Sequence, residues 1–150
     1  MKICEITDEE ALALYREKQR KRREIKRAIP NPFDTKSTGM PMYDDWLKDT
    51  DYAREQKGFD VYVVNISPDE YISACVKGFK STYESIIRSR TDSGKVEEYA
   101  ELMKSGETFP MLMVQYSLDG YFTQEGLHRA LAAKSLGIDK VPVLVAKELP

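Results

Sequence analysis

Cysteine and histidine are scarce in this sequence, and their scarcity excludes two common ways of stabilising a small protein. Its 150 residues include two cysteines, Cys4 and Cys75, and a single histidine, His128. A structural zinc site takes four ligands from these residue types, and disulfide-stapled domains contain several bridges. We therefore expect two reduced thiols, with neither a disulfide framework nor a zinc cluster.

Long apolar runs are also missing. No segment approaches the roughly 18 apolar residues that a membrane helix needs, and the first residues lack the apolar core of a secretory signal. These absences predict a cytoplasmic protein with no membrane partner. The chain is long enough to bury one core, so we expect one domain with an appendage.

Charge is unevenly distributed, although the net charge is only −2. Residues 16–27 hold eight basic side chains against two acidic ones, a local +6 that leaves the remainder near −8. Thr7 and Glu10 have the spacing of a capping box, which predicts a helix from there to about Ala28. Such a basic helix either contacts the phosphates of DNA or forms a solvated surface. The candidate nucleic-acid contacts are Arg20, Lys21, Arg22, Arg23, Lys26 and Arg27.

A long connection is predicted for residues 29–58, where prolines, a glycine and polar residues interrupt any period. It contains Trp46, the only tryptophan. The segment is either a lid over a site or, as we favour, a loop that Trp46 fixes to the core. We accordingly divide the chain into an N-terminal region, residues 1–58, and a folded domain, residues 59–150.

Strand patterns begin after this connection. Residues 61–66 form a β-branched and aromatic run that is typical of a buried strand, and residues 111–116 form a second. A turn signal then predicts a hairpin with residues 121–123. The last strand is expected at residues 141–146, where Pro142 favours an edge position or a bulge.

Helix patterns lie between these strands. Ser67, Pro68 and Glu70 have the pattern of a capped helix start, and apolar residues at helical spacing extend this helix to about Ser89. Further helices are predicted around residues 96–103 and 127–136. The sum of these elements is an α/β (α+β) domain with one mixed sheet and packed helices.

The start of the last helix has the features of an anion site. A strand followed by Glu125, Gly126 and a helix directs unpaired N–H groups and a partial positive charge at a ligand. Gly126 would allow a close approach, Arg129 could grip phosphate oxygens in bidentate fashion, and His128 could add a donor or carry a proton. The residues alone equally permit a structural histidine and an Arg129 paired with a glutamate.

Residues 126–137, together with the helix, glycine and Pro110-led strand upstream, resemble the second and first signature boxes of the ParB/sulfiredoxin superfamily. The second box reads Gly-Glu-Arg-Arg in ParB partition proteins, Gly-Cys-His-Arg in sulfiredoxins and Gly-His-His-Arg in free serine kinases. Here it reads Gly-Leu-His-Arg. Gly126 and Arg129 agree with all three, and His128 agrees with two. The resemblance covers about residues 60–146.

The resemblance implies a nucleotide site that binds CTP, ATP or ADP with magnesium. The residues it implies for phosphate or nucleotide binding are Gly126, Leu127, His128 and Arg129. Leu127 stands where sulfiredoxins have their cysteine nucleophile, which excludes sulfiredoxin chemistry. ParB proteins have a glutamate there, so hydrolysis of the ParB type lacks that residue too.

Three carboxylates are candidate general bases or magnesium ligands. Asp69 and Glu70 follow the first strand, where the related kinases place a catalytic carboxylate. Glu125 lies beside Gly126 and could adjoin a bound metal. Glu70 has an alternative role as a helix cap, and Glu125 has one as a partner of Arg129.

The function expected from these features is a ParB-like nucleotide-binding domain that could work with DNA through the basic helix. A phosphotransferase resembling the free serine kinases, or a ParB-like nuclease, is the enzymatic alternative. A non-catalytic interaction module is the third, and Leu127 is the residue that favours it.

Overall fold

The computed structural model describes residues 7–28, 30–51 and 58–150, without the side chains of residues 23–28. It divides into two compact units, residues 1–30 and residues 31–150. The second unit therefore includes residues 31–58, which the sequence analysis grouped with the N-terminal helix.

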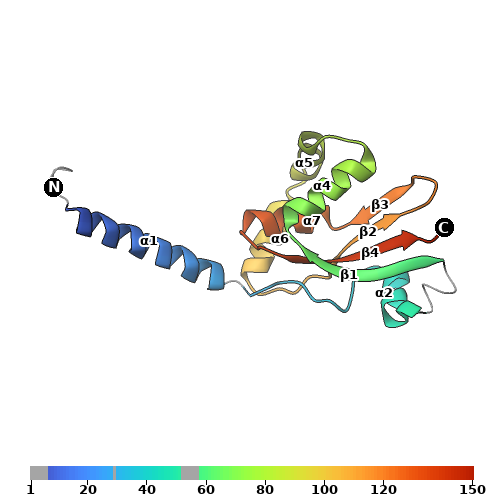
Figure 1. The fold of residues 1–150 in the computed structure, drawn as a ribbon, viewed down its shortest axis with the longest axis horizontal. Coiled ribbons are helices and arrows are strands. Elements are labelled where there is room, and N and C mark those ends of the chain that lie inside the picture. Colours follow the sequence, from blue (N-terminus) through green and yellow to red (C-terminus); the bar gives the residue numbers. More distant parts are fainter. Residues whose placement is uncertain (1–6, 29, 52–57) are drawn as a thin grey trace. The chain divides into compact units, whose positions relative to one another are not determined.

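The first unit is the helix α1 (Asp8–Ala28), drawn in blue in Figure 1. The N–H of Glu10 donates to Oγ1 of Thr7 and the N–H of Thr7 donates to Oε2 of Glu10, both at 3.2 Å. These reciprocal bonds confirm the predicted capping box and the predicted helix. Within the described part of the chain, neither α1 nor any other helix is long and apolar enough to cross a membrane.

The second unit is built on a four-stranded sheet with the order β1-β4-β2-β3. Its strands are β1 (Phe59–Ile66), β2 (Leu112–Tyr116), β3 (Phe122–Glu125) and β4 (Val141–Glu148). β4 pairs antiparallel with β1 and parallel with β2, and β2 forms an antiparallel hairpin with β3. The mixed sheet, the hairpin and the α/β (α+β) class are thereby confirmed.

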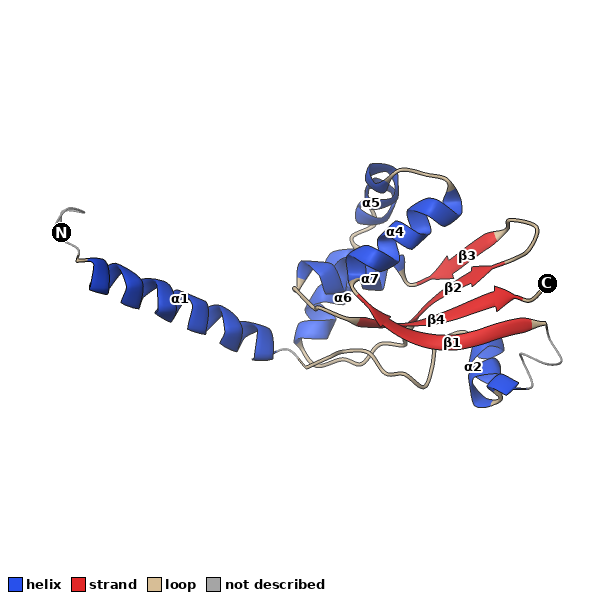
Figure 2. Ribbon diagram, in the orientation of Figure 1, coloured by secondary structure: helices blue, strands red, loops and turns tan. Residues whose placement is uncertain are grey.

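Helices lie on both sides of the sheet (Figure 2). α4 (Pro68–Phe79), α5 (Tyr83–Thr91), α6 (Lys95–Lys104) and α7 (Leu127–Ser135) lie on one side, and α2 (Pro41–Lys48) lies on the other. On α7 the side chains of Ala130, Ala132 and Ala133 are fully buried, since small residues allow the helix to pack closely. On the α2 side, Tyr43 is buried with Met111, Met113 and Leu144.

Trp46 fixes α2 to the sheet. Its ring centroid lies 5.2 Å from that of Tyr43 and 5.1 Å from that of Phe59, and it packs against the small core under α2. Aromatic pairs at these distances add to the stability gained from burial. The interpretation that Trp46 holds the connection to the core is confirmed.

The predicted helix ending near Ser89 is wrong, because two helices occupy that segment. α4 ends at Phe79, and Lys80 adopts the left-handed conformation with φ 53°. α5 then begins with its own cap, in which Oγ1 of Thr82 accepts from the N–H of Ser85 at 3.2 Å. Phe79 and Tyr83 keep the helical spacing of apolar residues across the break, so periodicity alone does not reveal it.

The prediction for Pro142 is also wrong, because β4 lies between β1 and β2 and is not an edge strand. Pro142 pairs with Asn65 of β1, but pairing with β2 starts one residue later, at Val143. At Pro142 the strand therefore has a single neighbour. A proline is tolerated at such a strand start because it interrupts no ladder on the open side.

Candidate functional site

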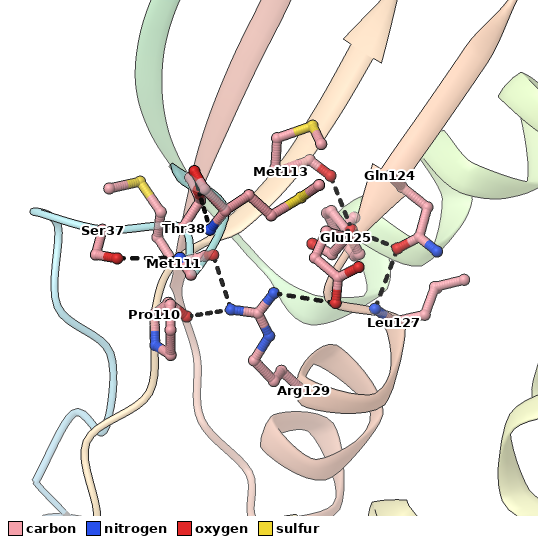
Figure 3. Close-up of polar contacts among 12 residues, drawn as sticks. Ser37, Thr38, Pro110, Met111, Met113, Gln124, Glu125, Leu127 and Arg129 are labelled. Carbon is pink, nitrogen blue, oxygen red and sulfur yellow. Dashed lines mark hydrogen bonds and ion pairs between the residues drawn. The ribbon is translucent and has the colours of Figure 1, made fainter. Parts of the chain in front are cut away.

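Arg129 lies in the first turn of α7 and is held from two sides (Figure 3). Its side chain is buried, and the residue is only 6% exposed. The Nη1 group donates to the carbonyl oxygens of Pro110 at 2.7 Å and Met111 at 2.9 Å. These bonds fix the plane of the guanidinium against the segment that leads into β2.

The other two nitrogens of this guanidinium form no hydrogen bond within the described residues. Nη2 lies 3.7 Å from Oε1 of Glu125, which is an ion-pair distance and too long for a hydrogen bond. Among the described residues no fully buried side-chain nitrogen or oxygen lacks a partner, so Nε and Nη2 are not completely enclosed. Burial lowers the pKa of Arg129, and the charge of Glu125 opposes that shift.

Arg129 lines a cavity of about 340 Å³. Arg129 and Glu125 form its charged wall, and the rings of Tyr99 and Phe109 form an aromatic wall with centroids 5.3 Å apart. The remaining lining residues are Thr38, Gly39, Met40 and Pro110. The cavity therefore combines a cation, a carboxylate and two aromatic faces.

The loop that forms one wall of the cavity is held by Asp44 of α2. The carboxylate accepts from the N–H of Thr38 at 2.6 Å, from Oγ1 of Thr38 at 2.9 Å and from Oγ of Ser37 at 3.1 Å. Burial alone would raise the pKa of Asp44, but these hydrogen bonds outweigh burial and lower it. Ser37 is also tied to the sheet, because its carbonyl accepts from the N–H of Met111 at 2.8 Å. The sequence analysis did not identify these loop residues, since side-chain hydrogen bonds leave no periodic pattern.

The α7 start is only partly capped. The N–H of Leu127 donates to Oε1 of Gln124 at 3.2 Å, and the first internal bond runs from Ala130 to Gly126. Within the described residues, no hydrogen bond reaches the N–H groups of His128 and Arg129, and the first turn contains no acidic residue. This helix start therefore keeps unpaired donors and a partial positive charge.

Gly126 is required by packing. It adopts φ +127°, and a Cβ added there would lie 2.7 Å from Cγ of Leu112 on β2. The sequence analysis assigned this glycine to the approach of a ligand, but the neighbour that needs the space is a core leucine. Leu127 is likewise a core residue, 1% exposed, and does not line the cavity.

His128 does not line the cavity. Its ring meets Tyr99 edge-on, with centroids 6.4 Å apart. Burial lowers the pKa of His128, and the nearby cations Arg90 and Lys95 lower it further. Both effects favour the neutral imidazole.

The predicted catalytic acids separate into two groups. Asp69 forms an ion pair with Lys134 at 2.8 Å and accepts from the hydroxyl of Tyr83 at 3.1 Å, so its pKa is lowered first by Lys134 and then by Tyr83. Glu70 belongs to the capping box of α4, because its carboxylate accepts from the N–H of Ser67 at 3.5 Å and its own N–H donates to Oγ of Ser67 at 3.1 Å. Neither residue lines the cavity, whereas Glu125 does.

Among the described residues that line the cavity, Glu125 is the one acid. No group of three or more His, Cys, Asp or Glu side chains in the described part of the chain could hold a metal ion. Magnesium commonly takes one or two protein carboxylates and completes its shell with phosphate oxygens and water. Glu125 fits that limited role and no larger one.

Tyr71 contacts the residues just before α7, and the sequence analysis did not identify it. It is fully buried, and its hydroxyl lies 3.0 Å from Oε1 of Gln124 and 3.1 Å from the carbonyls of Met113 and Glu125. Burial raises the pKa of Tyr71 well above its ordinary value. Tyr71 therefore joins α4 to the turn that precedes α7.

The predicted DNA-contacting residues lie on α1. The guanidinium of Arg20 forms an ion pair with Glu17 at 2.5 Å, while Lys21 and Arg22 are exposed. The side chains of Arg23, Lys26 and Arg27 lie outside the described residues.

Comparison of the chain with known protein families, with curated proteins and with solved structures finds no match. The resemblance to the ParB/sulfiredoxin superfamily thus remains a prediction from the quoted boxes.

Proposed function

We propose that the cavity at the start of α7 binds a phosphorylated ligand, most simply a nucleotide, with Arg129 as its principal contact. The observation that carries this proposal is that only one of the three guanidinium nitrogens of Arg129 forms hydrogen bonds within the described residues. Two carbonyls orient Nη1, while Nε and Nη2 form no hydrogen bond within the described residues, and Arg129 lines the cavity beside an incompletely capped helix start. A guanidinium fixed in this way loses little conformational entropy when it binds phosphate oxygens.

The aromatic wall favours a nucleotide over a smaller phosphate. Tyr99 and Phe109 offer ring surfaces on which a base can stack, and the volume of about 340 Å³ is within the range of small-ligand sites. CTP, ATP and ADP, the nucleotides implied by the sequence resemblance, all carry a base and phosphates that could use these two walls.

Glu125 makes the proposal depend on magnesium. Its carboxylate stands 3.7 Å from Nη2 of Arg129 and would repel a phosphate. Magnesium shared between this carboxylate and phosphate oxygens would remove the repulsion. A phosphotransferase or nuclease would have to rely on Glu125, because Asp69 pairs with Lys134 and Glu70 caps α4.

The alternative function is an interaction module that binds no small ligand, and one set of contacts of Arg129 favours it. The bonds from Arg129 to the carbonyls of Pro110 and Met111 would by themselves account for a buried arginine. On that view the guanidinium only satisfies the loop before β2.

Calorimetric titration with CTP, ATP, ADP and inorganic phosphate, each with and without magnesium, separates these alternatives. We expect the wild type to bind at least one nucleotide, more tightly with magnesium. Glu125→Gln removes the repulsion and should bind more tightly than the wild type when magnesium is absent. Tyr99→Ala should lower the affinity for nucleotides and leave the affinity for inorganic phosphate unchanged.

Arg129 itself is tested with a conservative variant, because Arg129→Ala would leave two carbonyls without their donor. We expect the guanidinium contact to contribute about 2 kcal/mol to the binding free energy, a factor near 30 in affinity. Arg129→Lys keeps the charge but not the planar fork, so it should retain only part of that contribution. Lys134→Met, at the other end of α7, is the matched control and should bind normally. If the wild type binds none of the four ligands, the interaction module stands instead.

For α1 we propose weak, sequence-independent DNA binding through its basic side chains. Eight of the residues between positions 16 and 27 are basic, and contacts to phosphates weaken steeply as salt rises. Removing residues 1–28 should abolish this binding in an electrophoretic titration. Equal binding by the shortened chain would leave α1 as a solvated helix.

A further inference from the structure

A second cavity, of about 510 Å³, lies on the face of the sheet that α4 crosses. Its floor comes from three adjacent strands, with Val64 on β1, Val143 and Val145 on β4, and Val114 on β2. Ala74 of α4 forms part of its wall. None of its lining residues belongs to the Arg129 cavity, so the two sites are separate.

One end of this cavity is apolar and the other is polar. At the polar end Lys147 pairs directly with Tyr116 across the parallel ladder, and Tyr62 pairs with Val145, two residues before Lys147. The three side chains therefore lie side by side on β1, β4 and β2. The opposite end, four residues along β1, is marked by Ile66.

Lys147 is an exposed residue at this end of the cavity. Its ammonium lies 6.0 Å from the centroid of the Tyr62 ring, and within the described residues it forms no ion pair. Asp60 is the residue that pairs with Lys147 in the antiparallel ladder. The ammonium also lowers the pKa of Tyr116, although burial raises that pKa more.

We infer that this cavity binds a small amphipathic anion, an aliphatic or aromatic carboxylate whose head group meets Lys147. An apolar floor with a few convergent polar groups is the usual composition of a small-ligand site. The ammonium of Lys147 supplies charge complementarity for a carboxylate, and the two tyrosine hydroxyls can donate to it. The apolar body would run along β1 from Tyr62 towards Ile66, a length of about 13 Å at 3.3 Å per residue.

Decanoate is a suitable probe, because its extended chain fits this length. It is titrated into the full chain below its micellar concentration, with decanol as the uncharged analogue and hexanoate as the short one. We expect decanoate to bind at least tenfold more tightly than either. Equal affinity for decanoate and decanol would overturn the role of Lys147.

Two variants locate the site. Lys147→Met should weaken decanoate about tenfold and leave decanol unchanged, whereas Lys140→Met, an exposed lysine outside the cavity, should change neither. Ala74→Phe places a ring in the cavity and should lower the affinity for both ligands at least tenfold. Its circular dichroism spectrum should match that of the wild type, which shows that the fold is intact. Normal decanoate binding by Ala74→Phe, or no decanoate binding by the wild type, would refute the proposal.

Discussion

Two helix starts in the second unit have opposite chemistry. At the start of α4, Ser67 and Glu70 form a complete capping box and Asp69 adds a further negative charge. At the start of α7, Gly126 provides no side-chain cap and the first turn has no acid. Side chains of the protein itself cap the start of α4, whereas the start of α7 has backbone N–H groups without a partner among the described residues.

If the proposed function holds, this difference distinguishes a purely structural helix start from one that binds a ligand. The capping box satisfies donors of α4 and thereby removes their capacity to hold an anion. The α7 start is held by contacts from outside the helix, through Gln124, Tyr71 and the packing of Gly126 on Leu112. The contacts that hold this helix start therefore leave the N–H groups of His128 and Arg129 without a hydrogen-bond partner among the described residues.

The largest effect on this comparison should come from Gly126→Ala. The variant combines a strained backbone, φ +127°, with a Cβ placed 2.7 Å from Cγ of Leu112, so we expect a loss of about 3 kcal/mol in the free energy of unfolding. Urea unfolding measures this loss. Gly106→Ala is the matched control, since φ is +94° there with no atom within 4 Å of the added Cβ, and it should cost about 1 kcal/mol. Equal costs would mean that Leu112 moves aside and that packing does not require this glycine.

The next effect is the loss of the α4 cap in Ser67→Ala. Removing the acceptor for the N–H of Glu70 should lower the free energy of unfolding by about 1 kcal/mol. The affinity of the Arg129 cavity for phosphate should not change, because Ser67 lies outside it. A parallel loss of stability and phosphate affinity would show that the two helix starts are coupled.

Several elements of this fold could be predicted because local sequence signals mark them. Capping boxes at Thr7 and Ser67 and the β-branched run of β1 identify their elements from a few neighbouring residues. The break at Lys80 and the central position of β4 were missed. Both depend on what the chain meets in space, since apolar spacing continues across the break and Pro142 looks like an edge residue until its neighbours are known.

The candidate site was predictable only in part for the same reason. Arg129 and Glu125 were identified from the helix start, and both line the cavity. Thr38 and Phe109 could not be found, because they reach the cavity from loops that carry no periodic signal. Asp69 was placed near the phosphates from the resemblance, but its partner Lys134 is visible only once α4 and α7 are packed together.

A smaller effect concerns the ion pair of Asp69. Because the pKa of Asp69 is lowered, chiefly by Lys134, the pair stabilises the protein above pH 3.8, the ordinary carboxyl value. That contribution is lost as the pH falls below 3.8 through the folded-state pKa. Both side chains are largely exposed, so solvent screening limits it to a few tenths of a kcal/mol. Thermal unfolding of Asp69→Asn against the wild type should differ slightly at pH 7 and converge near pH 2, and a difference that persists there would point to packing.

The smallest expected effect is a fractional proton taken up by His128 when a phosphate binds at the α7 start. The pKa of His128 lies below 6.5 because of burial and the neighbouring cations Arg90 and Lys95. A bound anion would offset those cations and raise the pKa again, so binding near pH 6 should draw less than one proton from solution.

Calorimetry at pH 6 in two buffers with different heats of ionisation measures this uptake. The phosphate group also titrates near pH 6, but its contribution is common to every variant. The informative quantity is therefore the difference between the wild type and His128→Asn, which should be a positive fraction of a proton. At pH 8, well above the ordinary pKa of histidine, little imidazolium forms in either state, so the difference should be much smaller. Identical uptake by both proteins at pH 6, with normal phosphate affinity, would mean that the bound anion lies too far from His128 to be held at the α7 start.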